Sequence, residues 1–195
     1  MAGRFIVFEG IDGAGKSTLL DGISDFLISR NVNVIKTAEP TNGTIGSIIR
    51  SGAVKKISQD AEALLFTADR ACHTQEILDW TRSGKTVLCD RYYASTIAYQ
   101  AANLNGTQSN KEWLKEINRP IITVPDITIL LDIDPEEGMR RVNDRGEKSK
   151  FEVTEYLKRV RSNYIELAKE NNFHIVDASR SKDDVLNKVI TIIGE

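Results

Sequence analysis

The chain has 195 residues, of which 41% are hydrophobic and 28% are charged. At about 150 residues per domain, this length predicts one domain spanning residues 1–195, which can bury a core without disulfides or a structural metal. The 26 Lys and Arg residues nearly balance the 28 Asp and Glu residues, and the net charge of −2 argues against a general nucleic-acid-binding protein.

The hydrophobic segments are too short to cross a membrane. Uninterrupted apolar runs such as 5–8 and 129–131 fall well below the roughly 20 residues that a transmembrane helix requires. The run at 5–8 is also too short for a secretory signal. Cys72 and Cys89 show no disulfide spacing, which favours a reducing compartment. We therefore expect a cytoplasmic protein without membrane contact.

Five β-rich runs alternate with amphipathic helical patterns. The runs cover 5–8, 32–36, 86–89, 127–133 and 173–176, and helical spacing of apolar residues covers 19–27, 61–79, 156–168 and 185–193. This alternation predicts a three-layer α/β fold with a five-stranded, mostly parallel sheet flanked by helices. Ligands of such folds bind at the carboxyl ends of the strands.

A phosphate-binding motif, G-x-x-x-x-G-K-[ST], follows the first run directly. Its glycines let backbone N–H groups surround phosphates, Lys16 bridges the phosphates, and Ser17 offers a hydroxyl to Mg²⁺. The expected ATP-binding residues are Gly10, Ile11, Asp12, Gly13, Ala14, Gly15, Lys16, Ser17 and Thr18. The motif predicts a nucleoside triphosphate ligand but does not separate a kinase from a GTPase or a motor. The absence of an Asn/Thr-Lys-x-Asp guanine-reading segment counts against a GTPase.

Further along the chain, a candidate nucleobase platform lies in the helix predicted over 61–79. Phe66 and Arg70 are four residues apart and therefore share a face of this helix. An aromatic ring beside a guanidinium suits a base, although a core Phe beside a surface Arg fits the pattern equally well. His73, in the same helix, shows no metal-ligand spacing, and we expect it to be structural.

Two apolar runs end in aspartate, and both aspartates are candidates for organising Mg²⁺. Asp90 is followed by Arg91 and by hydroxyl-bearing side chains at 92–96, which indicates a substrate site. The alternative is a local Asp90–Arg91 ion pair that merely ends the strand. Asp132 instead leads into Asp134-Pro135, the pattern of a helix N-cap followed by the first helical residue. We therefore expect Asp132 to be structural.

A basic segment follows the fourth run. It contains Arg140, Arg141, Arg145, Lys148 and Lys150. Phosphoryl transfer requires cations around the moving group, and a lid that closes over the reactants excludes water. A solvated helix face is the competing interpretation of such a segment.

Taken together, these motifs resemble the thymidylate kinase family from the first strand to the last helix. The resemblance rests on 10–18, Glu39-Pro40 with Thr44, Gly46 and Arg50, 66–70, 90–95, 98–100, 125–126, Arg141 and 145–147. It implies a P-loop kinase fold with a short mobile lid at about 141–152. It also implies an enzyme that transfers the γ-phosphoryl of ATP to dTMP with Mg²⁺, giving dTDP and ADP, and that forms a homodimer.

The resemblance also implies a binding site for the thymidine moiety of dTMP. Phe66 would stack on thymine, and Arg70 would read the base together with Thr96 and Gln100. Tyr99 would lie under the sugar, where it disfavours a 2′-hydroxyl. The implied substrate-binding residues are Asp12, Glu39, Pro40, Arg50, Phe66, Arg70, Arg91, Ser95, Thr96, Tyr99 and Gln100.

The phosphates have an implied set of their own. Asp12 would contact the sugar 3′-hydroxyl, while Arg91 and Arg50 would hold the acceptor phosphate. The implied catalytic residues are Lys16, Asp90, Arg91, Arg145 and Lys150, with Arg141 on ATP and with Ser17 and Asp90 on Mg²⁺.

The chain departs from the family pattern at two positions. Ala38 precedes Glu39-Pro40 where an arginine is usual, and Lys150 stands where a lid arginine is usual. Lysine lacks the bidentate fork of arginine, so Arg145 could take that role. Two other functions remain open: a kinase for another nucleoside monophosphate such as dUMP or UMP, and a non-catalytic ATP-binding module.

Overall fold

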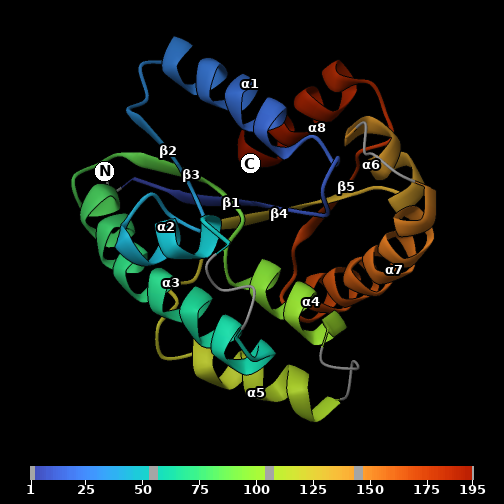
Figure 1. Ribbon diagram of the computed structural model, residues 1–195. Helices are drawn as coiled ribbons and strands as arrows, with labels where there is room; N and C mark the ends of the chain where they lie inside the picture. Colours follow the sequence, from blue (N-terminus) through green and yellow to red (C-terminus); the bar gives the residue numbers. More distant parts are fainter. Residues whose placement is uncertain (1–2, 53–56, 104–107, 143–146, 195) are drawn as a thin grey trace.

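The computed structural model describes residues 3–52, 57–103, 108–142 and 147–194. Its described strands form one parallel sheet in the order β2-β3-β1-β4-β5 (Figure 1). The strands are β1 (Phe5–Glu9), β2 (Val34–Ala38), β3 (Thr86–Asp90), β4 (Ile127–Asp132) and β5 (His174–Asp177). Each begins and ends within two residues of its predicted run, and the α/β fold is confirmed.

Helices cover both faces of this sheet. They are α1 (Lys16–Ser29), α2 (Thr44–Arg50), α3 (Gln59–Arg82), α4 (Tyr93–Asn103), α5 (Gln108–Asn118), α6 (Pro135–Val142), α7 (Glu147–Glu170) and α8 (Lys182–Gly194). In Figure 1, α1 and α8 lie on one face, α3, α4 and α7 lie on the other, and α5 packs outside α3 and α4. The three-layer arrangement matches the expectation from the sequence.

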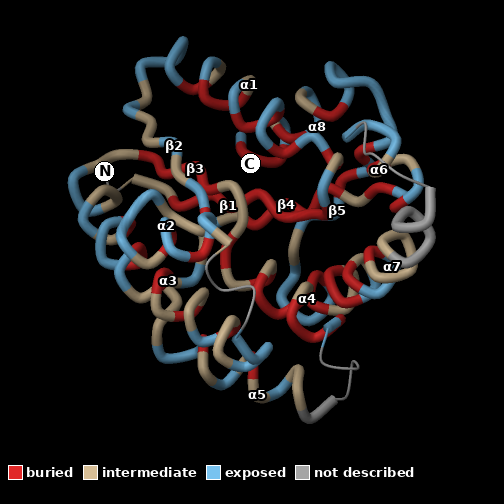
Figure 2. The backbone as a smooth tube through the Cα atoms, in the orientation of Figure 1, coloured by how far each residue is buried: buried red, intermediate tan, exposed pale blue. Residues whose placement is uncertain are grey.

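The core forms around the central strands, which are buried on both faces. Along β1, Phe5 and Val7 belong to one hydrophobic cluster, while Ile6 and Phe8 belong to the other. This alternation follows from the two-residue period of a strand, and continuous apolar runs are typical of parallel strands covered on both sides. Figure 2 shows this buried centre in red.

Local sequence signals account for two helix starts. Asp134 accepts a hydrogen bond from the backbone N–H of Glu136 at 2.9 Å, and Pro135 is the first residue of α6, both as predicted. Ser58 caps α3 by accepting from Ala61. By contrast, the apolar periodicity did not predict α2, α4 or α5. In the described part of the chain, no helix combines the length and the apolar character that a membrane span needs.

Candidate active site

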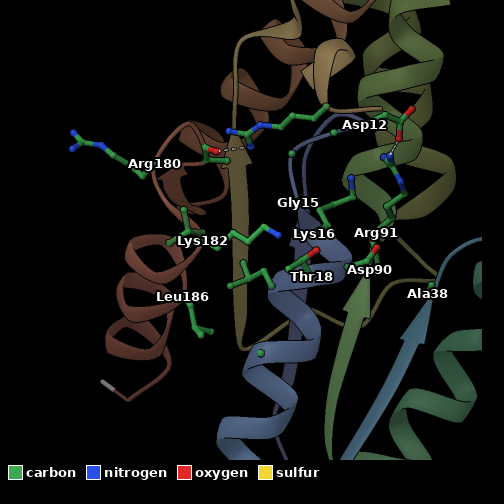
Figure 3. Close-up of a pocket in the computed structure, with 18 of the residues that line it drawn as sticks. Asp12, Gly15, Lys16, Thr18, Ala38, Asp90, Arg91, Arg180, Lys182 and Leu186 are labelled. Carbon is green, nitrogen blue, oxygen red and sulfur yellow. Dashed lines mark hydrogen bonds and ion pairs between the residues drawn. The ribbon is translucent and has the colours of Figure 1, made fainter. Parts of the chain in front are cut away.

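A cleft of about 1180 Å³ opens at the carboxyl ends of β1, β2 and β3. Residues 12–19 form its floor, and Ala38, Asp90 and Arg91 line the side toward β2 and β3. The opposite wall comes from the segment after β5 and from the first turns of α8 (Figure 3). This is the position at which a doubly wound sheet binds its ligands.

The loop after β1 requires glycine for its path. Gly13 has φ of 81°, in the left-handed region, and a Cβ atom there would lie 2.1 Å from the carbonyl oxygen of Gly138 in α6. The loop therefore packs directly on the α6 backbone. Its closing turn delivers Lys16 as the first residue of α1, whose N-terminal end favours anions.

Lys16 is buried in this loop and is 7% exposed. Its Nζ donates to the carbonyl oxygens of Gly10 and Ile11, each at 3.0 Å. Burial, followed by the nearby positive charge of Arg91, lowers the pKa of Lys16 to about 8. The ammonium group thus lies inside the loop, where a phosphate can replace the carbonyl contacts.

Ser17 and Asp90 meet at the base of the cleft. The Ser17 hydroxyl donates to Asp90 Oδ2 at 3.0 Å. The other carboxylate oxygen, Asp90 Oδ1, is buried and accepts no hydrogen bond from the described residues. A hydroxyl beside a carboxylate with a spare oxygen is a donor set that suits Mg²⁺.

Arg91 lies beside the phosphate loop in an unusual backbone conformation, with φ of 71°. Its guanidinium pairs with Asp12, donates to the Gly10 carbonyl at 3.3 Å and to the Tyr99 hydroxyl at 3.3 Å, and lies 5.0 Å from the Tyr99 ring centre. The structure therefore brings together Asp12, Arg91 and Tyr99, three predicted substrate-binding residues.

Glu9, at the end of β1, holds the turn that carries Arg91 through hydrogen bonds. The sequence did not indicate this role for Glu9. Its carboxylate is fully buried and accepts from the backbone N–H groups of Tyr92 and Ser95 at 2.9 and 3.2 Å. The Ser95 hydroxyl donates to it at 2.5 Å and the Tyr164 hydroxyl at 3.1 Å. Burial raises the pKa of Glu9 despite these hydrogen bonds and the positive charge of Arg91. Ser95, predicted to bind substrate, is thus engaged with Glu9.

The predicted base-reading residues lie behind the cleft wall. Arg70 is 1% exposed, and its guanidinium donates to Glu39 at 2.5 Å, to Thr96 at 2.9 Å and to Asn118 at 2.6 Å. Gln100 is also buried and follows Thr96 by one turn of α4. Among the described residues, Arg70 Nε and Gln100 Oε1 have no hydrogen-bond partner.

Three other predicted residues surround this region. Phe66 is half-buried on α3, one turn before Arg70. Pro40 lines the cleft, and its carbonyl oxygen accepts from Arg50 at 2.7 Å. Arg50 itself is exposed and lines the cleft as well, so its guanidinium can contact a phosphate group bound in the cleft.

Comparison of the sequence with known proteins identifies the family of this chain. The sequence model described as Thymidylate kinase matches residues 8–189. The chain belongs to the thymidylate kinase family. The match covers the phosphate loop, the turn at Asp90-Arg91 and α7, so the resemblance inferred from the motifs is confirmed.

Curated relatives from archaea cover almost the whole chain. A probable thymidylate kinase of Methanosarcina mazei is 40% identical over 100% of this chain and 97% of its own length. Those of Thermococcus onnurineus and Pyrococcus horikoshii are 39% and 38% identical, over 97% and 99% of this chain and 96% and 97% of their own lengths. The chain is accordingly an enzyme, a kinase that acts in nucleotide metabolism.

The two departures from the thymidylate kinase pattern have different outcomes. Ala38 lines the cleft and is exposed, so the position of the usual arginine does face the ligand space. Arg145 and the side chain of Lys150 lie outside the described residues, as does the centre of the expected lid. At the near end of that segment, Arg141 lines the cleft and donates to the Ala178 carbonyl at 2.9 Å.

Proposed function

We propose that Mg·ATP binds with its triphosphate on residues 10–18 and that dTMP binds against Arg91, so that the γ-phosphoryl passes to the dTMP phosphate. The observation that carries this proposal is the contact between the phosphate loop and the Asp90-Arg91 turn. Arg91 donates to Gly10 in that loop, and Asp90 accepts from Ser17. A donor site and an acceptor site for phosphates therefore adjoin each other.

On the ATP side, Lys16 and the N-terminal end of α1 stabilise the triphosphate. The Lys16 ammonium exchanges two backbone carbonyl acceptors for phosphate oxygens. Arg141, hydrogen-bonded to Ala178, supplies a guanidinium at the opposite wall of the cleft. Ser17 and Asp90 would hold Mg²⁺, which neutralises charge on the phosphates.

On the acceptor side, Arg91 holds the dTMP phosphate. Its guanidinium is fixed in place by Asp12 and Tyr99, so little conformational freedom is lost when the phosphate binds. The charge-assisted donors that face the phosphate bring the two reacting groups together. Phosphoryl transfer depends chiefly on the positioning of the reacting groups and on the stabilisation of their charge. Arg91 contributes to both on the acceptor side.

The choice of base follows from two buried polar atoms. Arg70 Nε is a hydrogen-bond donor, and Gln100 Oε1 is an acceptor. Thymine presents the complementary pair, a carbonyl acceptor beside the N3–H donor, whereas N3 of cytosine is an acceptor. Both protein atoms are shielded from solvent, so side chains over them must move as the base enters. Uracil presents the same edge, which makes dUMP the second candidate substrate.

We also propose that the protein is a cytoplasmic homodimer. The free thiols of Cys72 and Cys89 support a reducing compartment. The dimer rests on the family resemblance alone, and sedimentation of the purified protein measures it directly.

An acceptor panel tests the function. ADP release is followed with Mg·ATP and each of dTMP, dUMP, UMP, dCMP, AMP and GMP. We expect the highest kcat/KM with dTMP, a lower value with dUMP and none above background with dCMP. ADP release that is independent of any acceptor would contradict the kinase assignment, and a preference for UMP would contradict the choice of dTMP.

A further inference from the structure

Glu39 is held at both of its carboxylate oxygens by α3. Arg70 Nη2 donates to Oε2 at 2.5 Å, and His73 Nδ1 lies 2.9 Å from Oε1. The exposed fractions of the Arg70, His73 and Glu39 side chains are 1%, 0% and 4%. This is a fully buried charged group, in which each contact carries more free energy than it would at the surface.

The hydrogen bonds of His73 fix its tautomer. A carboxylate only accepts, so Nδ1 carries the proton that faces Glu39. The other ring nitrogen, Nε2, lies 2.7 Å from the Thr37 hydroxyl in β2 and accepts from it when the ring is neutral. Both ring nitrogens are thereby engaged, and the imidazole cannot rotate without losing two buried hydrogen bonds.

The pairing of Arg70 with Glu39 has an unusual consequence. Arginine and carboxylate commonly pair through two parallel hydrogen bonds. Here Glu39 takes one donor from Arg70, because His73 occupies its second oxygen, and Arg70 Nε keeps its N–H without a partner. The Thr96 hydroxyl accepts a second hydrogen bond from Arg70 Nη2, and Asn118 Oδ1 accepts one from Nη1, so both terminal nitrogens of the guanidinium are held in place.

We propose that His73 is a positioning residue for base recognition, because it occupies one oxygen of Glu39 and so leaves the Nε–H of Arg70 free for the substrate base. The inference rests on the proposed reading of the base by Arg70. Without His73, the free oxygen of Glu39 turns to Arg70 Nε, and the carboxylate takes the guanidinium through two hydrogen bonds. The Nε–H of Arg70 then donates to Glu39 and is not available to the base of dTMP.

Steady-state kinetics of His73→Phe test the proposal. Phenylalanine keeps a planar ring of similar volume and removes both nitrogens. We expect the KM for dTMP to rise about tenfold, as loss of one hydrogen bond to a charged group implies, with kcat and the KM for ATP changed less than about twofold. His73→Asn keeps an N–H near the position of Nδ1 and should recover most of the dTMP affinity.

Three further variants separate the possible outcomes. His174→Phe makes the same change at the chain's other histidine, which is exposed on β5, and should behave like the parent. In a Glu39→Gln background, His73→Phe should add less than about twofold, because both changes act through one contact. Arg70→Lys removes the Nε–H while keeping the charge, and should raise the KM for dTMP at least as far as His73→Phe does.

The results distinguish failure of the inference from failure of its premise. If Arg70→Lys leaves the KM for dTMP unchanged, Arg70 does not read the base. If Arg70→Lys has its effect but His73→Phe does not, or if His73→Phe raises both KM values equally, the positioning role is overturned. Should His73→Phe fail to fold, His73→Asn decides: parental dTMP affinity supports the proposal, and a tenfold higher KM in a folded variant contradicts it.

Discussion

Lys16 shows how burial tunes a single residue for its ligand. Removal from water and the neighbouring Arg91 both disfavour its ammonium form, while Asp90 and Asp12 oppose them, and the pKa settles at about 8. A lysine with a lowered pKa is protonated below that value and neutral above it. A bound triphosphate adds negative charge and raises the pKa again, so ATP binding takes up a proton near pH 8.

This linkage predicts a pH-dependent affinity for ATP. Between pH 6.5 and about 7.5 the dissociation constant should change little, and from pH 8 to 9.5 it should rise roughly tenfold for each pH unit above the pKa. Calorimetric titration with a non-hydrolysable ATP analogue and Mg²⁺ measures it. In Arg91→Gln the rise should begin at higher pH, because one of the two causes of the lowered pKa is gone. An identical pH profile in both proteins would refute this account of Lys16.

At the scale of secondary-structure elements, the start of α4 depends on a residue from another strand. The first N–H groups of a helix have no partner within the helix. Here the buried carboxylate of Glu9, at the end of β1, accepts from Tyr92 and Ser95, and the turn that results holds Arg91 at positive φ. Joining β1 to α4 therefore also fixes the guanidinium that we assign to the acceptor phosphate.

Glu9→Gln should expose this dependence. The amide oxygen can keep the two backbone N–H contacts, but its NH2 group then stands where Oε2 accepts from the Ser95 and Tyr164 hydroxyls. Both hydroxyls lose their acceptor there and must reorient, which should destabilise the protein by about 2 kcal/mol in urea denaturation. Exposed Asp25 on α1 provides the matched control, since Asp25→Asn makes the same chemical change in solvent and should stay within about 0.5 kcal/mol. A Glu9→Gln variant as stable as Asp25→Asn would show that α4 does not need this carboxylate.

The same elements show where sequence reasoning succeeds and where it stops. Apolar runs predicted the strands correctly, and in the central strands β1, β3 and β4 the reason is that a strand buried on both faces needs continuous hydrophobicity. The α4 segment stands out in the sequence only as a cluster of hydroxyl side chains, because it is buried on most sides and rich in alanine, and few large apolar residues mark its packed face. Glu9 could have been found, because it ends its apolar run just as Asp90 ends β3. The contacts around Arg70 join α3, α4, α5 and the residue that follows β2, and no local pattern predicts such a meeting.

Across the whole molecule, a net charge of −2 conceals an uneven distribution. The described residues that line the cleft include Lys16, Arg50, Arg91, Arg141, Arg180 and Lys182, against Asp12, Glu39, Asp90 and Asp183. Six cations against four acids give the cleft a positive excess. A concave site with an excess of positive charge attracts anionic substrates and raises their local concentration. Salt screens this attraction and shortens its range.

Lys182 provides the test of this field. It points from α8 toward α1 across the cleft, whereas Arg180 points away (Figure 3). Lys182→Glu changes the local charge by two units, and we expect the KM for ATP to rise about threefold to tenfold at low ionic strength and by less at 0.5 M salt. The KM for dTMP should change less, because Arg91 and Arg70 lie toward β3 and α3.

Lys188→Glu makes the same change on the same helix, at an exposed residue outside the cleft lining, and should leave both KM values within twofold of the parent. Equal effects of the two substitutions would mean that net charge, and not the cations around the cleft, governs how this kinase captures ATP.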